Sequence, residues 1–87
     1  MKKMNNTYFA SIVLAADYQA LAAERTVLTV TVSALPGNAA PAYLKNGAGQ
    51  EVPLQPGEWH TLVDIDLADL QAKGAIGDSL TIVGGTW

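Results

Sequence analysis

The chain has 87 residues, enough for one domain with a modest core. It has no cysteine, so neither a disulfide nor a cysteine-bound metal can reinforce that core. Its net charge of −3, with five scattered basic residues, argues against direct binding to nucleic acid, and no apolar run approaches the roughly 20 residues that span a bilayer. Only 15% of the residues are charged, against about a quarter in most domains, which suggests that a partner covers part of the surface.

The first predicted element is a strand over residues 7–15, TYFASIVLA. Two lysines before this apolar stretch also resemble the start of a secretory signal peptide, but the polar residues between them and the stretch oppose that interpretation. By composition, residues 16–24 favour a helical turn, or else an irregular extension of the first strand. We expect residues 1–25 to form an N-terminal strand or arm that contacts neighbouring subunits, and residues 26–87 to form a β-sandwich core.

Two longer strands follow from a period of two. In RTVLTVTVSA, residues 25–34, apolar and hydroxyl side chains alternate, which is typical of a half-buried strand. In EWHTLVDIDL, residues 58–67, the same period predicts that Trp59, Val63 and Ile65 enter the core.

Turn signals divide the rest of the chain into short pieces. Pro36-Gly37 and Pro56-Gly57 each predict a type II turn, and Asn46-Gly47 predicts a hairpin between PAYLKN and QEVPLQ. The segment LADLQAKG, residues 67–74, fits either a helical turn or a strand, and SLTIVGG, residues 79–85, fits a last strand. The sequence therefore predicts an all-β fold, a small antiparallel β-sandwich or barrel of about six to eight short strands.

No pattern of residues predicts a reaction. His60 is the only histidine and has neither a cysteine nor a second histidine as a partner for metal binding. The carboxylates of Asp64, Asp66, Asp69 and Asp78 lack a calcium-binding pattern, and we interpret them as a solvated strand face plus a turn residue whose carboxylate bonds its own turn. No glycine-rich phosphate loop is present. We therefore expect no catalytic, metal or cofactor site, and no enzymatic activity.

The aromatic side chains are better candidates for contacts with other subunits. Large aromatic residues near the chain ends are costly to leave exposed and are common at interface hot spots. The interface candidates are Tyr8, Phe9, Tyr18 and Trp87, and Trp87 is expected to dock either into its own domain or onto a neighbour.

The order of these signals also resembles a known group of proteins. It runs from TVTVSALPGN through AYL and a glycine-rich turn to VPLQPGE, TLVDIDL and GDSLTIVGG, and covers about residues 26–87. This layout resembles small β-sandwich structural proteins of tailed bacteriophages. The resemblance implies a virion protein that decorates (cements) the capsid or serves as a head-fibre base or tail accessory. Its expected partners are other virion proteins such as the major capsid protein, together with copies of itself, as in a trimer. No functional residue carries over from the resemblance.

The alternative is a small module that binds carbohydrate or a host surface. Exposure of Trp59 or Tyr43 on a flat face would favour this second function, and burial of both would count against it.

Overall fold

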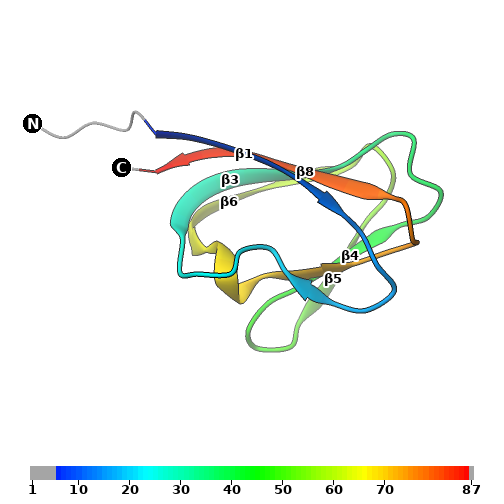
Figure 1. The fold of residues 1–87 in the computed structure, drawn as a ribbon, viewed down its shortest axis with the longest axis horizontal. Coiled ribbons are helices and arrows are strands. Elements are labelled where there is room, and N and C mark those ends of the chain that lie inside the picture. The colour runs from blue at the N-terminus through cyan, green and yellow to red at the C-terminus, as the bar shows by residue number, and fades with distance from the viewer. Residues whose placement is uncertain (1–5, 87) are drawn as a thin grey trace, which may run out of the picture.

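In the computed structural model, which describes residues 6–86, two four-stranded antiparallel sheets pack face to face (Figure 1). Sheet A has the strand order β1-β8-β3-β6, and sheet B has the order β2-β7-β4-β5. The elements are β1 (Asn6–Val13), β2 (Gln19–Ala20), β3 (Val27–Ala34), β4 (Ala42–Lys45), β5 (Glu51–Leu54), β6 (Trp59–Asp66), the 3-10 turn η1 (Leu67–Asp69), β7 (Gln71–Lys73) and β8 (Ser79–Thr86). This confirms the predicted all-β antiparallel sandwich.

The core lies between the sheets and is built mainly from aliphatic side chains. Strand β3 alternates strictly between buried and partly exposed residues from Leu28 to Ala34, as its sequence predicted. Its buried side chains meet those of β8 in the same sheet and of β4, β5 and β7 in the opposite sheet. The buried set is Leu14, Leu21, Leu28, Val30, Val32, Ala34, Ala42, Leu44, Leu54, Leu67, Ala72, Leu80 and Ile82.

The loop between β3 and β4 is tied to the start of β8. The side-chain amide of Asn38 donates to the Ser79 carbonyl (2.9 Å) and accepts from the Ser79 N–H (3.0 Å). The buried carboxylate of Asp78 accepts from the backbone N–H groups of Ala39 and Ala40 at 2.9–3.1 Å. The expectation that this carboxylate bonds its own turn was wrong, because the loop after β3 brings two unpaired N–H groups to it.

Three turns were predicted, and two of them have the expected form. Gly57 has φ +85°, as a type II turn requires, and the β4–β5 hairpin forms, with the positive φ at Gly49. Gly37 does not adopt a positive φ, so the turn closed by the Asn38 N–H and the Leu35 carbonyl (3.0 Å) is not of type II.

The helical turn predicted within residues 16–24 is absent, and the segment instead crosses from sheet A to sheet B. Leu14, just before this segment, and Leu21, within it, are buried, and between them the two residues of β2 pair with β7. The need to bury both leucines and to pair with β7 overrides the helix propensity of the alanines. Residues 67–74 contain both predicted alternatives, a 3-10 turn followed by a strand.

The predicted burial of Trp59 and Val63 was also wrong. Leu28 pairs with Ile65 but Val30 pairs with Leu62, so one residue of β3 opposes two residues of β6. At this bulge Asp64 has φ 52°, and the strand changes phase by one residue. Ile65 therefore faces the core together with Leu62, whereas Trp59 and Val63 point outward and are 61% and 65% exposed.

Candidate functional site

The most distinctive surface is the outer face of sheet A. Strands β1, β3 and β8 have eight residues each and contain no charged residue. They lie side by side in the sheet although they come from three separate parts of the chain. We call the uncharged face the outward side chains of these three strands beyond Val27, together with those of β6 up to its bulge: Thr7, Phe9, Ser11, Val13, Thr29, Thr31, Ser33, Trp59, Thr61, Val63, Thr81 and Val83. At the bulge and beyond it β6 carries Asp64 and Asp66, which form the margin of this face.

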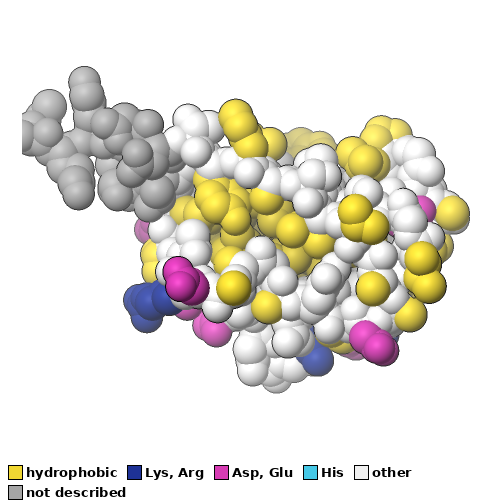
Figure 2. All heavy atoms as spheres, viewed as in Figure 1, with side chains coloured by type: hydrophobic (Ala, Val, Ile, Leu, Met, Phe, Trp, Pro, Cys, Tyr) yellow, Lys and Arg dark blue, Asp and Glu magenta, His cyan; other side chains and the backbone are white. Residues whose placement is uncertain are grey.

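Cross-strand pairing arranges these side chains in rows. One row runs from Phe9 through Val83 and Thr31 to Thr61, and the hydroxyls of the last two lie 2.9 Å apart. The row beside it ends at Trp59. In Figure 2 hydrophobic side chains stand along the upper margin, over sheet A, whereas most of the visible charged side chains lie in the lower half.

The exposure of this face is unusual for a surface that meets only water. Phe9 is 72% exposed, Val13 66% and Val83 51%. Single exposed apolar residues are normal, but here five apolar side chains share one face with seven hydroxyl side chains and without a charge among them, a composition that favours a surface covered by a partner. The hydroxyls of threonine and serine keep the face partly hydrated, and they cost less to desolvate than charges do.

The outer face of sheet B has the opposite character. Two ammonium groups contact the Tyr18 ring, with Lys45 Nζ 4.4 Å and Lys73 Nζ 4.8 Å from the ring centroid. Its hydroxyl donates to the Glu51 carboxylate. Partial burial, followed by this hydrogen bond and the negative charge of Glu51, raises the pKa of Tyr18 to about 12. Tyr43 lies on the same face, 5.9 Å from Lys73 Nζ.

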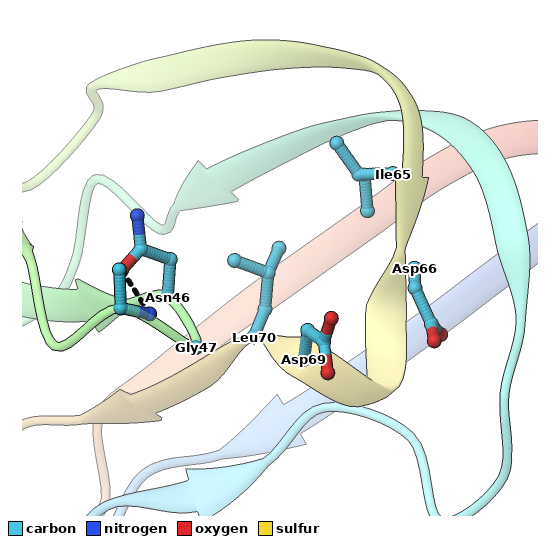
Figure 3. A pocket seen from close by; sticks show the side chains of 7 residues that line it. Asn46, Gly47, Ile65, Asp66, Asp69 and Leu70 are labelled. Atoms are coloured by element: carbon cyan, nitrogen blue, oxygen red, sulfur yellow. Dashed lines mark hydrogen bonds between the residues drawn. The ribbon is translucent and has the colours of Figure 1, made fainter.

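A hollow of about 570 Å³ lies between the β4–β5 hairpin and the end of β6 (Figure 3). Asn46 and Gly47 lie on one side of it, with Asp69 and Leu70 opposite. At the edge of this hollow, one oxygen of the Asp66 carboxylate, Oδ1, accepts hydrogen bonds from the N–H groups of Thr26 and Ala68.

These hydrogen bonds lower the pKa of the Asp66 carboxyl group. The bond from the Thr26 N–H is the main cause that lowers the pKa of Asp66, with contributions from the Ala68 N–H and the charge of Arg25. The titratable side chains that line the hollow are the carboxylates of Asp66 and Asp69. Within residues 6–86 no group of three or more His, Cys, Asp or Glu side chains could hold a metal ion.

The predicted interface residues are found at different places. Phe9 lies on the uncharged face, whereas Tyr8 points inward and packs against the core. Tyr18 lies on the outer face of sheet B, and Trp87 lies outside the described residues. His60 is exposed, as expected for a surface histidine.

Sequence reasoning missed Val13, Val63 and Val83 as surface residues. One signal was available, because residues 4–16, 26–44 and 79–87 contain no charged side chain. The absence of charge in these three segments does not reveal that they lie side by side, because the chain leaves sheet A between them.

Comparison with known proteins supports the fold and nothing finer. No family model matches the sequence, and no curated protein matches it. Among solved structures, the chain is similar to the protein NMB1881 from Neisseria meningitidis, with a TM-score of 0.62 and 12% sequence identity. The similarity covers 97% of this chain and 81% of that one.

At 12% identity this similarity shows a shared fold and carries no information about function. Within the part of the chain that the structure describes, no helix is long and apolar enough to cross a bilayer.

Proposed function

We propose that this protein is a non-enzymatic structural subunit of a tailed-phage virion. In this role it decorates the capsid or serves as an accessory head or tail subunit, and it stabilises the particle through contacts between subunits. The observation that carries the assembly role is the uncharged face, to which three adjacent strands without one charged residue contribute most of the side chains. The phage setting depends on the resemblance of residues 26–87 to phage structural proteins.

Physical chemistry links this face to assembly. A surface that must stay in water is usually rich in charges of both signs, because charges are well hydrated and oppose association. A surface that becomes covered loses its water, and each unpaired charge on it then costs several kcal/mol of desolvation. A face of valine, phenylalanine, threonine and serine avoids that cost and still dissolves as a free subunit.

The proposal is tested by looking for the chain in particles and by disturbing the face. Mass spectrometry of purified particles from the source should detect the protein among the structural components. The variant Val83→Glu places a carboxylate at the centre of the face, beside Phe9 and Thr31. It should fold and yet lose at least about tenfold in incorporation, because the charge must be desolvated.

Val83→Thr is the matched control, since it preserves shape and neutrality and should be incorporated normally. Absence of the protein from purified particles, or equal incorporation of the two variants, would refute the proposed function.

One observation favours the alternative, a module that binds carbohydrate or a host surface. Trp59 is 61% exposed on the uncharged face beside Ser33, and an exposed indole next to hydroxyls can stack on a sugar ring. Tyr43 is 39% exposed but lies on the opposite sheet, so the two aromatics do not form one platform. Glycan-array binding that Trp59→Ala abolishes and Tyr43→Ala leaves intact would support this function.

A further inference from the structure

Four strands form the edges of the two sheets, and three of them are protected against pairing with another chain. β2 has two residues, and β5 has four, with Glu51 and Pro53 among them. β6 is interrupted by the bulge and carries Asp64 and Asp66. Short length, proline, bulges and charges are the devices by which proteins prevent edge-to-edge association.

The fourth edge, β1, has none of these devices. Its eight residues pair with β8 without a shift in register and include neither a charge nor a proline. It ends the strand order of sheet A, and no other strand of residues 6–86 lies beyond it (Figure 1). A long, regular and uncharged edge of this kind is a template for β-augmentation.

The unpaired backbone groups of β1 can be identified from one hydrogen bond. The Leu14 N–H donates to the Asp78 carbonyl at 2.8 Å, so this residue pair is hydrogen-bonded. Hydrogen-bonded and non-bonded pairs alternate in an antiparallel ladder. The backbone N–H and C=O groups of even-numbered residues in β1 therefore face β8, and those of odd-numbered residues face away from it. Thr7, Phe9 and Ser11 therefore present N–H and C=O groups on the open edge. The carbonyl of Val13 already accepts from Gln19 Nε2 (2.8 Å).

From this geometry we infer that a second copy of the chain pairs its β1 with β1 in antiparallel orientation, in a register centred on Phe9. This inference rests on the proposed function and deepens it, because it names the first partner in the assembly. The two A sheets would join into one sheet of eight strands, four from each copy.

This register pairs every edge group of Thr7, Phe9 and Ser11. Phe9 pairs with Phe9 of the second copy, and Thr7 pairs with Ser11 in both directions. Three N–H groups from each copy then give six backbone hydrogen bonds between the copies. The outward Phe9 side chains would extend the uncharged face across the junction, and inward Tyr8 and Ala10 would extend the core.

Charge explains why a copy of the chain fits this edge and not another. Each chain carries a net charge of −3, so association between copies is opposed least where no like charges meet. Pairing through β6 would bring Asp64 and Asp66 of both copies together, whereas pairing through β1 brings none. A two-fold contact of this kind closes at two copies, so the state expected for the free protein is a dimer and not a trimer.

Cysteine cross-linking tests both the contact and its register, because the native chain has no cysteine. In the inferred register the two Phe9 Cα atoms lie about 5.5 Å apart, within the range that a disulfide spans. Phe9→Cys should therefore form a covalent dimer under mild oxidation.

Two control variants separate the inferred contact from random collision. Val13→Cys lies on the same strand with similar exposure, but the two copies of that residue would be offset by eight residues, roughly 26 Å. Val83→Cys lies on the same face, one strand away from the edge. Both should cross-link at least about tenfold more slowly than Phe9→Cys. Equal rates for the three variants would overturn the inferred contact.

Sedimentation of the unmodified full-length protein provides an independent measurement. It should show a concentration-dependent monomer–dimer equilibrium. Ser11→Pro removes one outward N–H without touching the ladder to β8, so it should remain folded by circular dichroism and become monomeric. A monomer at all concentrations, a trimer, or a dimer that persists in folded Ser11→Pro would overturn the inference.

The two proposals fail in different ways. A protein that dimerises through β1 but is absent from purified particles refutes the virion role and leaves the contact standing. A protein found in particles that is monomeric in solution, with no Phe9→Cys cross-link in the particle, refutes the contact and leaves the virion role standing.

Discussion

The substitution Gly84→Ala should destabilise the protein through a clash inside sheet A. Gly84 lies on β8 between β1 and β3, paired with Tyr8 and Val30. A Cβ atom there would lie 2.2 Å from the Thr29 carbonyl oxygen, 2.6 Å from Val30 Cγ1 and 2.9 Å from Val30 Cα. Two of these three atoms belong to the backbone, so relief requires β3 and β8 to move apart.

The expected size of the effect follows from two opposing terms. Overpacking of this kind costs about 3 kcal/mol at the upper end of its usual range. Replacing glycine by alanine also restricts the unfolded chain, which returns about 0.4–1 kcal/mol. The net loss should be about 2 kcal/mol in the free energy of unfolding, or about 8–16 °C in Tm for a domain of this size.

Urea and thermal unfolding followed by circular dichroism, at one fixed protein concentration, measure this loss. Gly37→Ala is the matched control, because its Cβ would meet nothing within 4 Å and its φ is not left-handed. This variant should be neutral or slightly stabilising. A Gly84→Ala protein within about 0.5 kcal/mol of the parent, or a Gly37→Ala loss of similar size, would refute the reasoning.

Three further predictions concern polar contacts. Asp78→Ala should lower the free energy of unfolding in urea by about 2–3 kcal/mol, because it leaves the N–H groups of Ala39 and Ala40 without their acceptor. Asp78→Asn retains an acceptor oxygen and should lose less, and equal losses for the two variants would contradict this account. Hydrogen bonds from backbone N–H groups lower the pKa of Asp66 in the folded protein. The ionised carboxylate therefore stabilises the fold above the ordinary pKa of 3.8, and this stabilisation is lost as the pH falls through the lowered pKa. In Asp66→Asn, the free energy of unfolding should decrease less with acid over this pH range than in the parent. Because the pKa of Tyr18 is raised from 10.0 to about 12, the free energy of unfolding should decrease between pH 10 and 12. The titration of Tyr18 itself can be isolated by subtracting the tyrosinate absorbance curve of Tyr18→Phe from that of the parent, and it should be centred near pH 12. A difference curve centred near pH 10 would show that the contact with Glu51 does not hold in solution.

Local sequence signals were sufficient wherever the chain makes regular structure with its nearest neighbours. The strict alternation from Leu28 to Ala34 specified both a strand and its buried face, because side chains of a strand point to opposite sides in turn. The glycine at position 57 specified its turn for a similarly local reason, since a positive φ is easy only for glycine.

Long-range pairing decided the features that local signals misjudged. Trp59 and Val63 have the phase of core residues, but the bulge at Asp64 turns them outward, and it is defined by pairing with β3. Residues 16–24 have the composition of a helix, but Leu21 must reach the core and β2 must pair with β7.

The candidate interaction surface divides between the two levels in the same way. The absence of charge from three stretches of the chain can be read directly from the amino-acid sequence, and this depletion already indicated a covered surface. The placement of β1, β8 and β3 in one sheet, with β1 as its open edge, follows from the pairing of strands that are distant in the chain. Hydropathy is a property of each residue, whereas an edge exists only once every other strand has found its partner.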